Sequence, residues 1–289
     1  MQLNQRRRTE FDAVRVYEYP EHLRAAVEGM PTAPGVYVFH GEEGDLPLYI
    51  GKSVNLRHRV LSHLRNADEA LMLRQTKRIS HIRTAGEIGA LLLEASMIKQ
   101  QHPLLNQKLR RSRQLCSLQM QDVKLAVVYS KDLNFATEPD LYGLFASRQS
   151  ALQALRDLAD LQKLCYGVLG LEKLAKGKPC FRAMVRQCAG ACRGDESHEV
   201  HDARLTEALE GMRVTCWPFS GAVGLVERHG EDFQMHVIRN WMYLGSVAEE
   251  KSATSEAKKL ARMAAGFDAD GYKILCRPLL SGTAEIVLL

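Results

Sequence analysis

Glu94 is a carboxylate set into an apolar helical stripe, where it is unfavourable unless a cation accompanies it. The residues three and four positions away are all apolar: Ala90, Leu91, Met97 and Ile98. Burial of a carboxylate costs free energy unless a positive charge or a metal ion compensates it. Glutamate oxygens suit Mg²⁺ or Mn²⁺, which need only one or two carboxylates. The alternative is a glutamate at the edge of the stripe that reaches solvent, and residue chemistry alone favours that alternative.

Arg59 and His63 lie four residues apart, so on a helix they share one face. The planar guanidinium of Arg59 matches two oxygens of a phosphate. An imidazole such as His63 can accept a proton near neutral pH or bond to a tyrosine hydroxyl. Phosphodiester hydrolysis needs an activated nucleophile, a cation for the developing charge and a metal ion. Either residue alone would suit an ordinary surface helix, and only the set indicates this chemistry.

The elements that must position these side chains begin with two short apolar runs, GVYVF at 35–39 and PLYIG at 47–51. Each run carries a tyrosine, and a loop of Gly, Glu and Asp joins them, which predicts a two-stranded hairpin with a longer connection. Asn55 is placed to cap the helix that follows. The periodicity then predicts a helix near 69–78, a strand at 80–85 and a long helix from about 86 that Pro103 ends.

The rest of the chain shows weaker patterns that alternate between strand and helix. The segment RHGED at 228–232 stands between two apolar runs, which is typical of a hairpin. Other predicted elements are strands at 124–130 and 141–147 and helices at 21–27, 149–165, 200–213 and 252–263, with only strands after the last helix. The predicted divisions are a lead-in over 1–30, a first domain over 31–110, a middle region over 111–213 and a C-terminal sheet domain over 214–289.

The composition of the 289 residues is that of an ordinary globular protein, long enough for two domains or one large one. No run of 18 apolar residues occurs, so no membrane span is expected. The N-terminus MQLNQRRRTEF has basic residues but no apolar run behind them, unlike a secretory signal. The default expectation is a cytoplasmic protein without a membrane partner.

Positive charge is concentrated beside the candidate chemistry. The net charge is +5, but residues 52–113 contain thirteen Lys and Arg against four Asp and Glu. A segment of that density favours a polyanion as partner, most simply nucleic acid. The alternative is a solvated helical surface, which basic runs often are.

The two tyrosine-bearing runs, written GVY and YIG, resemble the signature motifs of the GIY-YIG endonuclease family. The resemblance places the first signature tyrosine at Tyr37 and the second at Tyr49, followed by Gly51 and Lys52; for Gly51 a backbone role is expected. The family's remaining site positions fall at Arg59, His63, Glu94 and Asn106. The resemblance implies an α+β fold: a small antiparallel sheet flanked by helices, then a Cys-containing helical region and a small C-terminal α+β domain.

The reaction that the family implies is hydrolysis with one metal ion, Mg²⁺ or Mn²⁺, held by Glu94. A water molecule, deprotonated by or through the hydroxyl of Tyr37, attacks phosphorus in line with the leaving 3′ oxygen. Arg59 neutralises the phosphate, and Tyr49 and Lys52 support it. On the resemblance, all of these residues belong to one catalytic site.

Within the family, the segment EIGALLLEASMIKQQHPLLNQKLR is most similar to the N-terminal half of the bacterial excinuclease UvrC, and the chain looks like a shorter homologue of it. UvrC has tyrosine where His63 stands, which leaves both Tyr37 and His63 open as the general base. The resemblance implies nucleotide excision repair, with damaged double-stranded DNA and UvrB, loaded by UvrA, as partners. No second carboxylate-rich nuclease site and no helix-hairpin-helix motif is visible, so one incision on the 3′ side of a bulky lesion is expected.

Four cysteines form a second candidate site: Cys180, Cys188 and Cys192 fall within thirteen residues, and Cys165 lies upstream. Four thiolates can hold Zn²⁺ or an iron–sulfur cluster. None of the spacings is the C-x2-C of common zinc modules. UvrC has a similar arrangement that resembles a four-cysteine iron–sulfur site, so a [4Fe-4S] cluster or Zn²⁺ is implied. The alternative is a group of reduced, partly buried thiols.

Two other classes of function stay open. One is a catalytically inactive GIY-YIG adaptor that only binds nucleic acid, and the intact set of Tyr37, Tyr49, Arg59, Glu94 and Asn106 argues against it. The other is a mobile-element nuclease with its own sequence reader, but no recognition helix, zinc finger of usual spacing or basic zipper is visible. A nuclease that acts in DNA repair is the favoured function.

Overall fold

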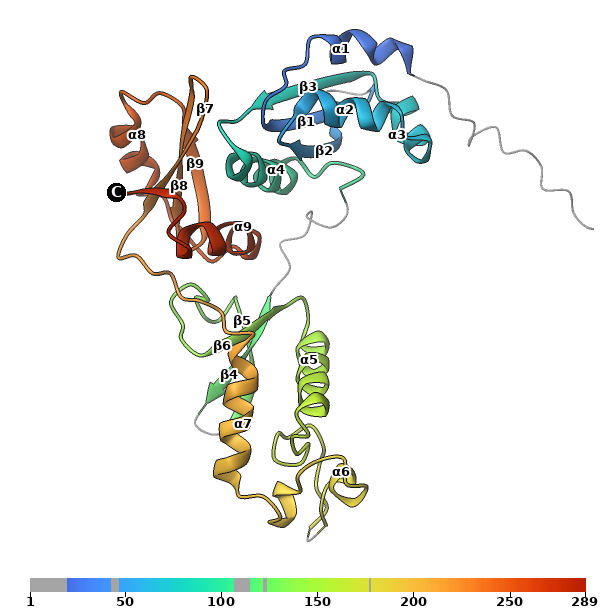
Figure 1. The fold of residues 1–289 in the computed structure, drawn as a ribbon, viewed down its shortest axis with the longest axis vertical. Helices are drawn as coiled ribbons and strands as arrows, with labels where there is room; N and C mark the ends of the chain where they lie inside the picture. The colour runs from blue at the N-terminus through green and yellow to red at the C-terminus, as the bar shows by residue number, and fades with distance from the viewer. Residues whose placement is uncertain (1–19, 43–46, 107–114, 122–123, 177) are drawn as a thin grey trace, which may run out of the picture.

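The computed structural model describes residues 20–42, 47–106, 115–121, 124–176 and 178–289. It confirms an α+β chain, with small antiparallel sheets flanked by helices. The sheets of the N-terminal and C-terminal units lie near one end of the molecule, and the middle unit extends away from them to its far end at α6 (Phe181–Met184) (Figure 1). No helix within those ranges is long and apolar enough to cross a membrane.

The first sheet contains the predicted hairpin and one later strand. β1 (Gly35–His40) lies between β2 (Pro47–Ser53) and β3 (Arg78–Arg83), and both pairings are antiparallel. β3 begins and ends two residues before the predicted strand at 80–85. Because β1 is the central strand, it is buried along almost its whole length.

The helices that flank this sheet are η2 (Glu21–Leu23), α1 (Arg24–Glu28), α2 (Leu56–Leu64), η3 (Ala67–Glu69), α3 (Ala70–Gln75) and α4 (Glu87–Gln101). Successive side chains of a strand point to opposite faces. Tyr37 and Phe39 therefore face a core shared with α1, α2 and α3, whereas Val36 and Val38 face α4. The alternation of β1 places helices on both faces of this sheet.

The residues just before the hairpin belong to the same core. Leu23, Val27 and Met30 are at most 3% exposed and pack with the aromatic side chains of β1. The described part of the expected lead-in is thus packed on the first unit, with no break in the core between them. The rest of that lead-in, residues 1–19, lies outside the described ranges.

The middle unit has a sheet with the order β5-β4-β6, formed by β4 (Cys116–Gln121), β5 (Lys124–Tyr129) and β6 (Leu141–Phe145). β5 and β6 are the strands predicted at 124–130 and 141–147. β4 was not predicted, because its polar residues hide the strand pattern. Gln119 is buried, and its amide donates a hydrogen bond of 2.8 Å to Glu138. The helices of this unit are α5 (Arg148–Leu161), α6, η4 (Ala191–Arg193) and α7 (His198–Glu210).

The C-terminal unit has the order β10-β7-β8-β9. β7 (Val223–His229) and β8 (Asp232–Arg239) form the predicted hairpin, followed by β9 (Met242–Val247), α8 (Ala253–Leu260), α9 (Ala269–Leu280) and β10 (Glu285–Leu288). The expectation of strands alone after α8 is wrong. The apolar run that contains Pro278 resembles a strand in the sequence. In the structure it is part of a helix, which Asp268 caps and whose inner face is buried through Leu275 and Leu279.

Candidate active site and cysteine cluster

Tyr37, His63 and Glu69 form a chain of hydrogen bonds that runs from two buried side chains to a half-buried carboxylate. The Tyr37 hydroxyl lies 2.6 Å from Nε2 of His63, and Nδ1 of His63 bonds to one carboxylate oxygen of Glu69. The other oxygen of Glu69 accepts a bond of 3.1 Å from the Asn66 amide. Tyr37 is 1% exposed and His63 5%. The fold thus joins two predicted site residues to a third, Glu69, that the sequence analysis did not single out.

The partners fix where the protons lie in this chain of bonds. A carboxylate only accepts hydrogen bonds, so Nδ1 of His63 carries a proton and Nε2 accepts from the Tyr37 hydroxyl. Burial lowers the pKa of His63 below its usual value, although Glu69 opposes the shift. Burial likewise raises the pKa of Tyr37. At neutral pH both groups are therefore uncharged, with the hydroxyl proton of Tyr37 directed at His63.

Gly51 of the YIG run makes room for the Tyr37 ring. The β1–β2 register pairs Tyr37 with Gly51. A Cβ on residue 51 would overlap the Tyr37 hydroxyl and lie 3.0 Å from Cε2 of its ring. Gly51 is not among the described glycines with positive φ, so the expected backbone role is wrong. Space for the Tyr37 side chain is what requires glycine here.

Tyr49 and Arg59 flank the Tyr37 hydroxyl. The ring centroids of Tyr37 and Tyr49 are 6.3 Å apart, and those of Tyr49 and His63 5.7 Å. Burial and the charge of Glu94 raise the pKa of Tyr49, while Arg59 and contact with Tyr37 oppose the shift. Arg59 itself is exposed, and its pKa is raised by the contact with Tyr37. A permanent cation therefore stands at the surface beside the two tyrosines, where a phosphate can approach.

Glu94 reaches this site from α4. One carboxylate oxygen accepts a bond of 3.1 Å from the backbone N–H of Lys52, and no hydrogen bond to the other oxygen occurs within the described ranges. Burial raises the pKa of Glu94, and Lys52 and Arg59 oppose that shift. The Lys52 ammonium bonds to the exposed Glu87 at 2.6 Å. The backbone of Lys52 thus orients Glu94, while its side chain is engaged elsewhere.

Asn106 holds the edge strand of the sheet. Its Oδ1 accepts from the backbone N–H of Ile50 at 2.8 Å, and its Nδ2 donates to the Ile50 carbonyl at 2.7 Å. The preceding residue, Leu105, donates a backbone bond of 2.8 Å to Leu48. The amide therefore replaces a missing strand partner beside Tyr49. This geometry gives Asn106 a positioning role, and a direct catalytic contact stays a prediction.

The donor set around Glu94 fits a single divalent cation. Mg²⁺ keeps several waters and needs only one or two protein carboxylates. Glu94 offers an oxygen with no protein partner among the described residues, and a cation beside it would favour its ionised form. Its charge also acts on both Tyr37 and Tyr49. The tyrosines, Arg59 and Glu94 therefore share one electrostatic environment.

The four predicted cysteine ligands meet at the far end of the middle unit. The sulfurs of Cys165, Cys180 and Cys192 lie within 4.8 Å of one another, and that of Cys188 lies 4.0 Å from Cys180. None of them is in a disulfide. Among the described residues this trio is the one group of three or more Cys, His, Asp or Glu placed to hold a metal ion. Four close thiols fit either Zn²⁺ or an iron–sulfur cluster.

Burial works against ionisation of these thiols. It raises the pKa of Cys188 to about 11 and that of Cys192 to about 12. Burial also opposes ionisation of Cys180, but hydrogen bonds from the Ala183 and Gly167 backbone lower its pKa overall. A bound cation would reverse the balance, because metal ligands must be deprotonated. A cation bound between the sulfurs would therefore favour their thiolate forms.

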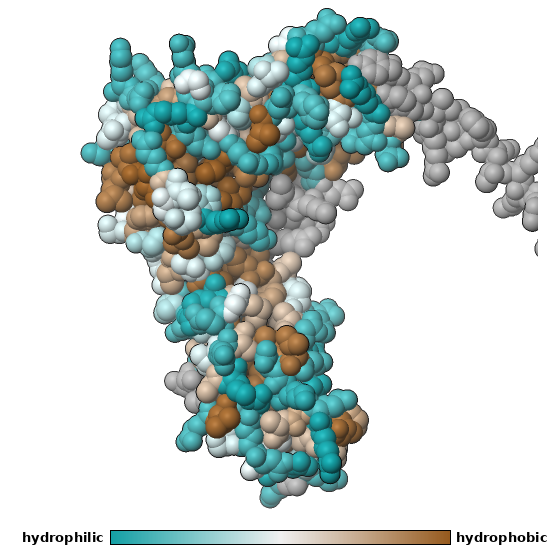
Figure 2. All heavy atoms as spheres, in the orientation of Figure 1, coloured by the Kyte–Doolittle hydropathy of each residue, from teal (hydrophilic) through white to brown (hydrophobic). Residues whose placement is uncertain are grey.

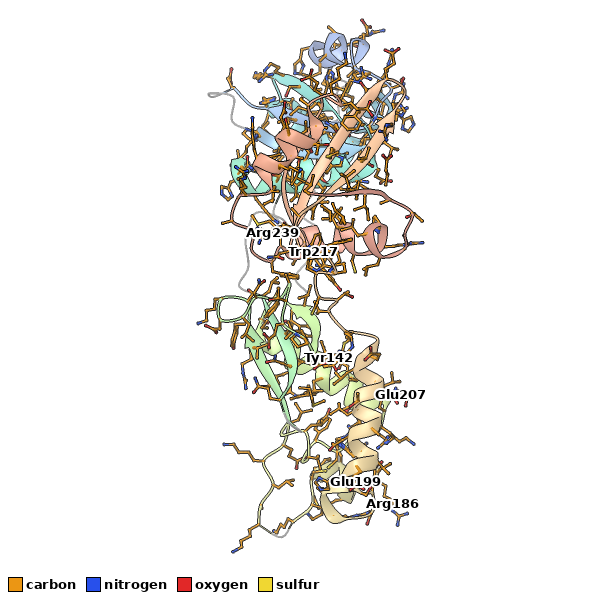
Figure 3. All side chains as sticks on the ribbon, turned by 90° about the vertical axis from the view of Figure 1, so that its left-hand side faces the viewer. Tyr142, Arg186, Glu199, Glu207, Trp217 and Arg239 are labelled. Carbon is orange, nitrogen blue, oxygen red and sulfur yellow. The ribbon has the colours of Figure 1, made fainter. Side chains whose placement is uncertain are left out.

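The cysteine cluster lies far from the tyrosines. Two views at right angles place its unit away from the other two: α6 stands at its far end in Figure 1, and Arg186 lies there in Figure 3, with Trp217 at the junction to the C-terminal unit. Phe181 and Met184 of α6 are 59% and 58% exposed, and apolar surface gathers there in Figure 2. The molecule thus carries two separate candidate sites.

A helix-start pattern could have drawn attention to Glu69. Asn66 caps η3 by accepting from the backbone N–H of Asp68 at 3.1 Å. An Asn followed three residues later by Glu is a common signature of such a start. The pattern would have placed Glu69 on an ordered turn after α2. Its contact with His63, however, depends on how that turn folds back.

Three family profiles match successive parts of this chain. They are the UvrC-like GIY-YIG domain over residues 33–107, the UvrC/Cho excinuclease middle domain over 105–211 and the excinuclease Cho C-terminal domain over 222–289. The first match confirms the resemblance drawn from GVY and YIG. The other two extend it along the chain.

A relative of high identity gives the same result, and two more distant proteins are also similar. Excinuclease Cho of Escherichia coli K12 is 60% identical over 96% of this chain and 93% of its own length. UvrABC system protein C of Caldicellulosiruptor saccharolyticus is 29% identical over 65% of this chain and 32% of its own. The solved GIY-YIG N-terminal endonuclease domain of UvrC from Thermotoga maritima, bound to magnesium, is 31% identical over 30% of this chain and 97% of that chain, with a TM-score of 0.28.

Proposed function

The chain belongs to the excinuclease Cho family and is a nuclease, and we propose that it makes a single incision on the 3′ side of a bulky lesion in double-stranded DNA. The observation that carries the proposal is the Tyr37–His63–Glu69 chain of hydrogen bonds. A histidine held by a carboxylate and bonded to a hydroxyl is an arrangement that removes protons. It stands beside Arg59 and Glu94, a cation and a metal-binding carboxylate.

The proton leaves the attacking water through the tyrosines. Tyr49 is half-buried, whereas Tyr37 is 1% exposed, so solvent reaches the pair at Tyr49. The water oxygen attacks phosphorus as its proton passes to the tyrosine pair, and Tyr37 gives its own proton to Nε2 of His63. Glu69 stabilises the imidazolium that forms. In this proposal Tyr37 and His63 act in series, so the general base is not one of them alone.

The phosphate is bound by positive charge. Arg59 lies against the non-bridging oxygens and compensates the charge that develops on them. Glu94 would hold a divalent ion, which would supply further stabilisation of the charge that develops on the leaving 3′ oxygen. The new P–O bond forms with water oxygen, the P–O3′ bond breaks, and the leaving oxygen takes up a proton from solvent. Lys52, paired with Glu87, would have to leave that partner to contact the DNA.

The partners we propose are damaged DNA and UvrB, loaded by UvrA. The basic segment 52–113 supports DNA, since thirteen Lys and Arg lie there against four acidic residues. UvrB is proposed from the family. A catalytically inactive adaptor is the competing proposal, and the continuous hydrogen-bond chain counts against it, because mere DNA binding does not require such a chain.

For the cysteine cluster we propose a bound Zn²⁺ or [4Fe-4S] cluster on Cys165, Cys180, Cys188 and Cys192. Four free thiols at short range, three of them within 4.8 Å, support the site. The two ligands differ in colour, because an iron–sulfur cluster absorbs visible light. Metal analysis and a visible spectrum of anaerobically purified protein distinguish them, and a metal-free, stable protein would exclude both.

The decisive experiment is incision of an end-labelled duplex with one bulky adduct, in Mg²⁺ with UvrA and UvrB. Wild type is compared with Glu94→Gln, and Glu28→Gln on α1 is the control for an exposed glutamate. We expect one cut 3′ of the adduct, lost in Glu94→Gln while DNA binding stays within severalfold. No cut by wild type would favour the adaptor, and a cut by Glu94→Gln at the wild-type rate would refute the metal assignment.

A further inference from the structure

The helix that carries Glu94 is capped by a residue from the C-terminal unit. α4 has no side-chain cap of its own, since its N-cap is Gly86. The first N–H groups of a helix lack partners within it. Glu227 of β7 supplies the missing acceptors: its Oε1 accepts from the backbone N–H of Ile88 at 3.0 Å, and its Oε2 accepts from that of Gly89 at 2.6 Å. A carboxylate at this end also complements the helix dipole.

A buried network holds Glu227 in place. Nε2 of His236 lies 3.0 Å from Oε2 of Glu227, and Nδ1 of His236 lies 2.6 Å from the Ser246 hydroxyl. The Tyr243 hydroxyl lies 2.6 Å from the same Ser246 oxygen. His236 is fully buried. The capping carboxylate is therefore held by three strands of one sheet acting together, β7, β8 and β9.

The cap fits because two glycines leave space for it. A Cβ on Gly86 would overlap the Glu227 carboxylate, and one on Gly89 would lie 2.6 Å from Cε1 of His236. Gly86 has φ of −173°, an extended conformation that any residue adopts. Gly89 lies inside the helix, where glycine is a poor helix former. The close approach of the C-terminal unit thus explains both glycines, whereas neither the backbone conformation of Gly86 nor the helix propensity of Gly89 does.

The same unit contacts α4 and its approach at other points. The backbone N–H of Ala85 donates to Gln234 of β8 at 3.0 Å. Near the other end of α4, Lys99 pairs with Asp268 at 2.6 Å and Asp270 at 2.9 Å. Leu92, between these points, is buried in the core of the C-terminal unit. α4 therefore packs against the first sheet on one side and is held by the C-terminal unit on the other.

We propose that the C-terminal unit positions the nuclease site through Glu227, which fixes α4 and thereby Glu94. Glu94 lies about one and a half turns beyond the capped N–H groups, on the same helix. A shift or rotation of α4 would move the Glu94 carboxylate relative to the Lys52 N–H and the two tyrosines. Glu227 is in this sense a positioning residue, and His236 orients it. The inference rests on the proposed reaction at Glu94.

The test compares Glu227→Gln with Glu231→Gln in the full chain. Glu231 is an exposed glutamate in the turn of the same hairpin. An amide accepts through one oxygen only, so Glu227→Gln leaves one N–H of α4 without its partner. We expect Mn²⁺ affinity without DNA and the incision rate at saturating DNA each to fall about 10- to 100-fold, the usual loss when an orienting partner is removed. KM for DNA should stay near wild type, and Glu231→Gln should match wild type.

A double-mutant cycle shows whether the two surfaces act on each other. Gly86→Ala pushes a methyl group into the Glu227 carboxylate and should lower rate and Mn²⁺ affinity in the wild-type background. In a Glu227→Ala background the carboxylate is gone, so Gly86→Ala should add almost nothing. Gly86→Ala lies on the other side of the contact, so it keeps the test valid if Glu227→Gln does not fold.

The outcomes separate this inference from the proposed function. Loss of Mn²⁺ binding and incision in Glu94→Gln, with both kept at wild-type level in Glu227→Gln and Gly86→Ala, would overturn the positioning role alone. Wild-type Mn²⁺ binding and incision in Glu94→Gln would overturn the reaction at Glu94 and the inference with it. Independent, additive effects of Gly86→Ala and Glu227→Ala would also contradict the cap.

Discussion

The tyrosine–histidine–glutamate chain and the cysteine cluster are both groups of polar side chains that are largely removed from solvent, yet they are held in opposite ways. Each member of the first has a protein partner: Tyr37 bonds to His63, His63 to Glu69, and Glu69 to Asn66. The sulfurs of the second mostly face one another, 3.7 Å apart for Cys165 and Cys180. Protein groups thus satisfy the hydrogen bonds of the first site, whereas the thiols of the second lie mainly against one another, an arrangement that suits a bound metal ion or cluster.

The two sites also differ in the helices and strands that carry their side chains. Tyr37 stands on the central strand of a sheet, and His63 on a nine-residue helix. Cys180 precedes α6, a helix of four residues, and Cys192 lies in η4, which has three. Among the described residues, the one buried side-chain nitrogen or oxygen without a hydrogen bond is Nε of Arg182, also in α6. Regular structure organises the nuclease site, and we expect a ligand to organise the cysteine cluster.

The largest expected effect is on the incision rate of a Tyr37 variant that keeps its fold. Tyr37→Phe keeps the ring in its core and removes only the hydroxyl, so the proton path to His63 is cut. We expect the single-turnover incision rate to fall about 10²- to 10⁴-fold, the range that general base catalysis supplies. Circular dichroism and thermal unfolding should stay close to wild type. Tyr129→Phe in the middle unit is the control, and a loss below about threefold for Tyr37→Phe would contradict the relay.

The next effect concerns stability without a direct change in the nuclease site. Cys180→Ser removes one of the four proposed metal-binding thiols. We expect the middle unit to lose its bound metal ion or cluster, and its free energy of unfolding to fall by about 4 kcal/mol or more. Metal analysis and urea unfolding measure both quantities. Cys216→Ser is the matched control, because Cys216 lies outside the cluster and donates to the Glu138 carbonyl at 3.3 Å, as serine can. Equal stability of the two variants would remove the contrast between the sites.

Glu69→Gln sharpens the comparison by weakening the relay at its far end. The amide can still lie beside His63, but it does not stabilise an imidazolium as a carboxylate does. We expect the incision rate to fall about 10- to 100-fold, with DNA binding unchanged. Asp68→Asn changes the neighbouring exposed residue in the same turn and should have no effect. If the two variants incise equally well, Glu69 is only a structural partner of His63.

The smallest expected effect is a shift in pH dependence. Nε2 of His63 accepts a proton only while the imidazole is neutral, and burial lowers its pKa below the ordinary 6.5. The incision rate should therefore stay high down to pH 6.5 and fall as pH drops further, through the lowered pKa. Glu69 opposes that shift, so Glu69→Gln should lower the pKa more and move the acid limb to lower pH. An acid limb that moves upward in this variant, or not at all, would exclude His63 as the group that titrates.

The sequence by itself determined the features whose signals lie within a few residues of one another. Alternating apolar residues around Tyr37 and Tyr49 specify the hairpin, and Asn55 specifies the start of α2 by accepting from the His58 N–H at 3.0 Å. Pro103 follows the end of α4, as predicted. The position of Glu94 in an apolar stripe could also be read locally. Each of these is a property of a strand or helix period, which needs no distant partner.

Tertiary structure alone decided which of these groups meet. His63 and Glu69 come together because η3 turns back after α2, and the Lys52 side chain is drawn to Glu87. Glu227 caps α4 although it lies 139 residues after Ile88 in the sequence. The first two contacts depend on how segments fold back within one unit, and the third depends on how two units pack, so the period of a strand or helix carries no signal for them. The sequence supplied the reactive groups, and the packing of the first and C-terminal units determined how they are oriented.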